Sequence, residues 1–173
     1  MQDRFQPLEA GYSIQIFESI LLIDSNVWNS INEKIPFYQT YNFLSKIESI
    51  HKDIAFRYVL VSKDDKIIAA LYVQMLDFSF KNLVNYGGQA SGGIKGKFKA
   101  FIAQKNTKLL NLGNVFFTGD KGVICRDEDM VIPFIPKIFK AIHSSFSEKK
   151  PSAFLVANIY LQDEDKCMDF CNS

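Results

Sequence analysis

The strongest local pattern in the chain lies in residues 56–78. Two runs rich in β-branched and aromatic residues, FRYVLVS and IIAALYVQMLDF, flank the four polar residues KDDK. This pattern predicts an antiparallel hairpin with a short exposed turn. The second run is long and almost entirely apolar, so we expect a central strand that is covered on both faces. Gln74 and Asp77 are then candidates either for polar groups that face a cleft or for side chains bonded to neighbouring backbone.

The segment before this hairpin predicts one strand and two helices. Residues 13–23 have the composition of a strand. Asp24 or Ser25 can cap a short helix over about residues 27–33, because a small oxygen-bearing side chain accepts a free N–H of the first turn. Pro36 precedes a second helix, and we expect its apolar face in the core. That face consists of Phe37, Tyr41, Leu44, Ile47 and Ile50.

A glycine-rich stretch, NYGGQASGGIKGKFK, follows at residues 85–99. It does not match a phosphate-binding P-loop, since Ser91 stands where the first glycine belongs and Phe98 stands where a hydroxyl is required. We expect a solvated loop that leads into a helix over about residues 99–105. Three lysines in it offer an alternative role in anion binding. They are Lys95, Lys97 and Lys99.

Residues 109–161 contain a strand, a loop, a helix and a second strand. The strand over 109–117 has Gly113 and Asn114 in its middle, which predicts a bulge or a splayed strand. The loop TGDKG then precedes a helix, an arrangement whose backbone N–H groups hold anions in many α/β proteins. We expect the helix from Ile132 or Pro133 to about Ser147, and a strand over 153–161. The apolar face of this helix consists of Ile135, Ile138, Phe139, Ile142 and Phe146, with His143 near its end.

Length and charge favour one folded domain that does not primarily bind nucleic acid. The chain has 173 residues, 47% of them hydrophobic, and a net charge of only +1. We expect a tail at 1–12, a domain at 13–161, and a second tail at 162–173 that could begin a truncated second module. No stretch approaches the ~20 apolar residues of a transmembrane helix, and no secretory signal is evident, so a cytoplasmic location is expected.

The three cysteines predict neither a disulfide framework nor a metal site. Cys125, Cys167 and Cys171 are an odd number, and the last two have no second pair of ligands to complete a zinc site. We expect reduced thiols and no metal.

The predicted order, β-α-α-β-β-(α)-β-α-β, resembles the GNAT acyltransferase fold, an α/β fold with a mixed, mainly antiparallel central sheet and flanking helices. Three segments support the resemblance: PFYQTYNFLSKIE, YVLVSKDDKIIAALYVQMLDF and LLNLGNVFFTGDKG. Together, over residues 13–161, they resemble the amino-terminal module of bacterial two-module proteins, a group that includes Fem-type peptidoglycan aminoacyltransferases and peptidoglycan-related acetyltransferases.

The resemblance implies an N-acyltransferase whose donor is acetyl-CoA, another acyl-CoA or aminoacyl-tRNA. Its acceptor would be the amine of a small molecule or of a cell-wall precursor. In that fold the splayed strand and the loop after it hold the acyl donor. Carried over to this chain, the cofactor-binding residues would be Gly113, Asn114, Gly119, Lys121 and Gly122.

The sequence also departs from the family at this loop. The acyl-CoA signature has Arg or Gln, two residues, Gly, one residue, then Gly or Ala; with Gly119 as the first glycine, Phe116 and Lys121 occupy the other two positions. Three acids over 127–129 also precede the helix and would repel a pyrophosphate. The module is therefore either an acyltransferase, active or degenerate, or a non-catalytic scaffold. A scaffold would form a homodimer or one wall of a two-module enzyme whose second module is missing here.

No general base stands out in the sequence. Glu48, Asp77 and His51 are the polar candidates, and each also has a structural explanation.

Overall fold

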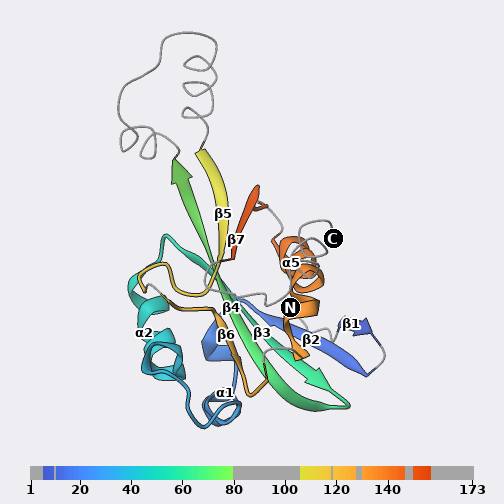
Figure 1. Ribbon diagram of the computed structural model, residues 1–173. Coiled ribbons are helices and arrows are strands. Elements are labelled where there is room, and N and C mark those ends of the chain that lie inside the picture. Colours follow the sequence, from blue (N-terminus) through green and yellow to red (C-terminus); the bar gives the residue numbers. More distant parts are fainter. Residues whose placement is uncertain are drawn as a thin grey trace, which may run out of the picture.

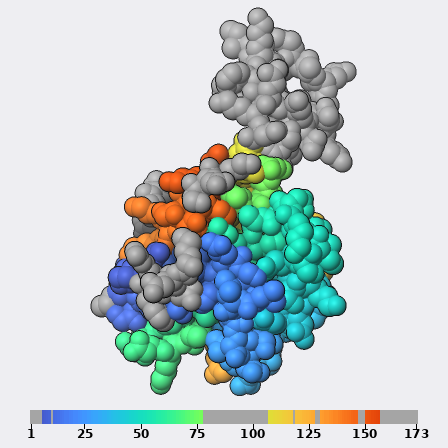
Figure 2. Space-filling view, turned by 180° about the vertical axis from the view of Figure 1, so that it is seen from behind, coloured from blue at the N-terminus to red at the C-terminus, as the bar shows by residue number. Residues whose placement is uncertain are grey.

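The computed structural model describes residues 6–9, 11–79, 106–117, 119–127, 130–146 and 150–156. It shows a mixed α+β molecule built on a curled, mostly antiparallel sheet of seven strands (Figure 1). Helices α1 and α2 cover one face of this sheet and α5 lies against the other. In Figure 2 the segment of α5 (orange) lies at the left of the surface and that of α2 (teal) at the right. The predicted class, helices flanking a mainly antiparallel sheet, is confirmed at this level.

Six strands follow one another across the sheet in the order β1-β2-β3-β4-β5-β7. Their bounds are Gln6–Glu9, Tyr12–Phe17, Ala55–Lys63, Lys66–Ser79, Asn106–Leu112 and Ala153–Val156. All neighbours are antiparallel except β5 and β7, which run parallel. The seventh strand, β6 (Val123–Cys125), also pairs with β4, next to β5.

The predicted hairpin is the centre of the sheet. Strands β3 and β4 pair from Ala55 opposite Met75 to Lys63 opposite Lys66. The turn between them consists of Asp64 and Asp65, whose φ angles of 47° and 62° are left-handed values that aspartate tolerates better than most residues. Residues 69–75 of β4 are buried, as expected of a central strand.

The helices pack on the sheet through the residues that the sequence places on one face. The short helix α1 (Ser25–Ser30) begins after Asp24, whose carboxylate accepts hydrogen bonds from the N–H groups of Asn26 and Val27 at 2.7 and 3.3 Å. A 3₁₀ turn, η2 (Phe37–Gln39), leads into α2 (Tyr41–Ile50). After another such turn, η4 (Ile132–Phe134), helix α5 runs over Ile135–Ser145. All five apolar residues predicted for this last helix are buried.

Two apolar cores lie on the two faces of the sheet, because successive side chains of a strand point to opposite faces. The core under α5 contains Val59, Val61, Leu71 and Val73 among others. The core under α1 and α2 contains Trp28, Tyr58, Ala70 and Tyr72 among others. The indole N–H of Trp28 donates to the carbonyl of Gln39 at 2.8 Å and so joins α1 to η2.

Several predicted boundaries are wrong. The strand expected over 13–23 ends at Phe17, because Ser19 caps a 3₁₀ turn, η1 (Ile20–Leu22), with its hydroxyl 3.2 Å from the Leu21 N–H. Strand β1 lies in the expected amino-terminal tail. The strand expected over 109–117 ends at Leu112.

The prediction that the apolar face of the second helix lies in the core is wrong at both ends of that face. Phe37 lies in η2 and not in the helix, and Ile50 is the last residue of α2. Both side chains are exposed, whereas Leu44 in the middle of α2 is buried. The glycine-rich loop with its three lysines, the helix at 99–105, and residues 157–173 with Cys167 and Cys171 lie outside the described residues. Among the residues described, no helix is long and apolar enough to cross a membrane.

Candidate functional site

A closed loop, residues 113–122, leaves the sheet between β5 and β6. Both of its ends bond to the same residue of β4: the Gly113 N–H donates to the Tyr72 carbonyl at 2.9 Å, and the Tyr72 N–H donates to the Gly122 carbonyl at 3.0 Å. The two glycines together therefore occupy the place of one residue in a continuous strand. We call the place where Gly113 and Gly122 lie against each other the neck of the loop. A Cβ on Gly122 would lie 2.1 Å from the Gly113 nitrogen, so only glycine fits there.

The buried carboxylate of Asp120 fixes this loop to the rest of the molecule. One oxygen accepts hydrogen bonds from the Gly122 N–H at 2.9 Å and the Gln39 side-chain amide at 2.8 Å. The other accepts from the Asn114 N–H at 2.8 Å and from the hydroxyl of Tyr72. These donors come from η2, from β4 and from both ends of the loop. Such a set of donors replaces the water that a carboxylate loses on burial.

Three amide side chains form hydrogen bonds with backbone groups of the first turn of the loop. The side-chain oxygen of Gln74 accepts a hydrogen bond from the Val115 N–H at 2.9 Å. The side-chain oxygen of Asn114 accepts one from the Phe116 N–H, also at 2.9 Å. The amide of Asn111 donates to the Gly113 carbonyl at 2.9 Å. Gln74 was one of the two polar candidates on the central strand, and its amide oxygen is bonded to backbone.

Two tyrosines, Tyr58 and Tyr72, lie side by side beneath the loop on β3 and β4, with ring centroids 6.4 Å apart. Burial raises the pKa of Tyr72 strongly, and the negative charge and hydrogen bond of Asp120 raise it further. Burial likewise raises the pKa of Tyr58, and the carboxylate of Glu48 adds to the effect. Both hydroxyls therefore keep their protons at neutral pH, and that of Tyr72 acts as a donor to Asp120.

Aromatic rings cover the loop on the side of α2. Phe117 stacks on Tyr38 with centroids 5.5 Å apart and meets Phe37 and Phe43 edge to face. Phe116 stacks on the His51 ring at 4.4 Å. Part of this layer is exposed to solvent: Phe37 by 66%, Phe116 by 50%. We call the exposed residues Phe37, Ile50, Val115 and Phe116 the aromatic end.

The five residues predicted to bind acyl-CoA all belong to this loop. The N–H groups of Gly113, Asn114 and Gly122 donate to acceptors within the protein. Gly119 is exposed, and Lys121 is half-buried. The loop is also followed by β6 and not directly by a helix. This geometry gives no support for a phosphate-binding cradle formed by those three N–H groups, and acyl-CoA binding stays a prediction.

The three candidate bases make structural contacts. Glu48 accepts the Ile20 N–H at 3.0 Å. Asp77 is exposed and forms an ion pair with Lys108. His51 is the C-cap residue that follows α2, and its ring stacks on Phe116.

Sequence reasoning missed Asp120, whose only local signal is its position in a glycine-flanked turn.

Cys125, in β6, is buried. The described part of the chain contains no group of three or more His, Cys, Asp or Glu side chains that could hold a metal ion.

No family model matches the sequence, and neither the curated proteins nor the solved structures include a significant match.

Proposed function

We propose that this chain is a catalytically degenerate GNAT-like module that associates with a second copy of itself through the aromatic end. The observation that supports this best is the bonding of Asp120. Its carboxylate accepts hydrogen bonds from the N–H groups of Asn114 and Gly122 and from the hydroxyl of Tyr72. This is the loop in which the family resemblance would place an acyl donor. These groups hold the loop in one shape.

The order of the sheet supports the GNAT-like part of the proposal. Four neighbouring strands, β2 to β5, are antiparallel, and the chain then crosses through α5 to the parallel strand β7. The resemblance implies a mixed sheet whose second half has a strand, a helix and a strand in that order, and parallel neighbours need a long connection of this kind.

The surface above this loop supports the association part. The members of the aromatic end are exposed apolar side chains, and exposed apolar groups that gather on one surface are typical of protein interfaces. The hydrogen bonds of Asp120, Gln74 and Asn114 fix the loop that presents Phe116, so little conformational entropy would be lost on association. Apolar side chains can pack against a copy of themselves, which suits a two-fold symmetric dimer.

Sedimentation equilibrium of the full chain over a range of concentrations tests this proposal. We expect reversible dimerisation that weakens at least about tenfold in Phe116→Ser and in Phe37→Ser, since each removes a large apolar side chain from the interface. The matched control is Leu155→Ser, which alters an exposed apolar residue on β7. A wild-type chain that stays monomeric throughout, or a Leu155 variant that loses dimerisation equally, would contradict the proposal.

The second candidate is an active N-acyltransferase, which the parallel pair β5 and β7 with its crossover helix favours. It predicts that acetyl-CoA stabilises the chain, by about 2.7 kcal/mol at a hundred times its dissociation constant. The degenerate module predicts an unchanged melting temperature at millimolar acetyl-CoA. A clear upward shift would replace our proposal with this candidate.

A further inference from the structure

A cavity of about 560 Å³ opens where β4 begins and β6 ends. Its walls come from α1, from the first residues of β4, and from the residues that follow β6. Cavities of roughly 300–1,000 Å³ are the usual size of small-molecule sites. It lies apart from the aromatic end and has no part in the function proposed above.

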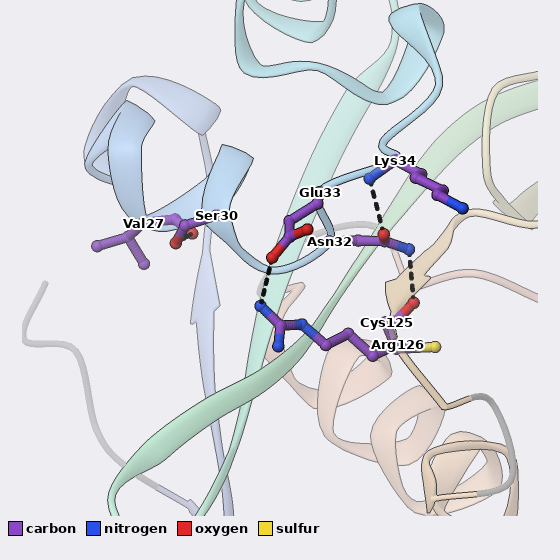
Figure 3. Close-up of polar contacts among 7 residues, drawn as sticks. All are labelled: Val27, Ser30, Asn32, Glu33, Lys34, Cys125 and Arg126. Atoms are coloured by element: carbon purple, nitrogen blue, oxygen red, sulfur yellow. Dashed lines mark hydrogen bonds and ion pairs between the residues drawn. The ribbon is translucent and has the colours of Figure 1, made fainter.

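Hydrogen bonds hold the segments beside two walls of this cavity. The side-chain amide of Asn32, just after α1, donates to the carbonyl of Cys125 at the end of β6 at 2.8 Å and accepts the Lys34 N–H at 2.9 Å (Figure 3). The turn that begins β4 is held as well, since the Asp64 N–H donates to the Gly11 carbonyl at 2.8 Å. The end of α1 and the turn before β4, which border two walls of the cavity, are therefore held by hydrogen bonds.

The lining combines an apolar wall with charges of both signs. Ile31, Ile67 and Met130 contribute to the apolar part. The charged part consists of Asp65, Lys66, Arg126 and Asp127. The guanidinium of Arg126 reaches towards Glu33, with the closest N and O atoms 3.8 Å apart (Figure 3).

That ion pair leaves Arg126 able to bind a ligand. Its two side chains are 70% and 87% exposed, so the pair contributes little to stability. A guanidinium has five N–H donors, and a carboxylate can take two of them at once.

We propose that this cavity binds a zwitterionic small molecule with an apolar side chain, such as an aliphatic amino acid or a short peptide of such residues. Arg126 binds its carboxylate, Asp65 binds its ammonium group, and the apolar wall covers its side chain. A simple anion would meet the charges of Asp65 and Asp127, and a simple cation would meet Lys66 and Arg126. A neutral apolar molecule would desolvate these charges without replacing their hydration.

The test is a titration of the full-length ¹⁵N-labelled chain with the dipeptide L-leucyl-L-leucine, followed by NMR. We expect saturable shifts of the amide signals of Ile31, Ile67 and Met130. Arg126→Gln and Asp65→Asn should each weaken binding about tenfold, the usual effect of losing one charged hydrogen-bonded contact. Both side chains are at the surface, so these variants should melt as the wild type does.

Two controls make the result decisive. Lys52→Gln removes an exposed charge outside the cavity lining and should leave the Kd unchanged. N-acetyl-leucyl-leucine amide keeps the apolar side chains but has neither terminal charge, and should bind at least about tenfold more weakly. Equal binding of this capped peptide, unchanged binding by both cavity variants, or an absence of shifts at millimolar dipeptide would overturn the proposal.

Discussion

A buried carboxylate is tolerated only where hydrogen-bond donors replace its lost hydration, and Asp120 meets that condition with donors from three parts of the chain. We predict that Asp120→Ala lowers the free energy of unfolding by about 3–5 kcal/mol, because several buried donors lose their acceptor at once. Urea denaturation measures this change. Asp120→Asn keeps the shape but turns an NH₂ group towards donors, so it should be destabilising as well.

The matched control is Asp77→Ala, which removes an exposed carboxylate paired with Lys108. Surface ion pairs contribute about 0–1 kcal/mol, so the loss should be small. An Asp120 variant no less stable than the Asp77 variant would show that the carboxylate does not hold the loop.

Whether a residue's role can be predicted depends on how far away its partners are in the sequence. Asp24 caps α1 by bonding residues two and three positions ahead, and the sequence was enough to nominate it. Asp120 bonds Tyr72 and Gln39, which are 48 and 81 positions away. No local pattern encodes such contacts, so the residue central to the site was missed.

The loop element, residues 113–122, depends on three glycines that lie in the left-handed region at φ of 88°, 91° and 66°. An added methyl on Gly119 would meet nothing within 4 Å, whereas on Gly113 it would lie 2.9 Å from the Gly122 nitrogen, and on Gly122 only 2.1 Å from the Gly113 nitrogen. We predict graded destabilisation of the alanine variants, about 1–2 kcal/mol at Gly119, more at Gly113 and most at Gly122. Equal losses in urea denaturation at all three positions would show that the neck is not closely packed.

Elements were predictable where the apolar period was long and unbroken. The β3–β4 hairpin and the buried face of α5 follow directly from their sequence patterns. Strand β6 has only three residues, and β5 stops at Leu112 although three more apolar residues, Val115 to Phe117, follow Gly113 and Asn114. The chain leaves the sheet there because the side chains of Gln74 and Asp120 bond the N–H groups of Val115 and Asn114.

At the scale of the whole molecule, the buried tyrosines make stability sensitive to alkaline pH. An unfolded tyrosine loses its proton near pH 10, whereas burial and the nearby carboxylates raise the pKa of Tyr58 and Tyr72 in the folded chain. Above about pH 10 the folded state therefore binds more protons than the unfolded state, and stability falls as pH rises. The contribution is fully present below that pH.

We predict that each of these tyrosines lowers the free energy of unfolding by about 1 kcal/mol between about pH 10 and 11, and that the slope approaches about 1.4 kcal/mol per pH unit above about pH 11. Tyr72→Phe should remove about half of this slope, and the double variant with Tyr58→Phe should remove the rest. Urea denaturation at a series of pH values measures the slopes. Lysines also titrate in this range, but they do so in the wild type and in the variants alike, so the difference between proteins isolates the tyrosines. Parallel curves for wild type and double variant would mean that water reaches both hydroxyls in the folded state.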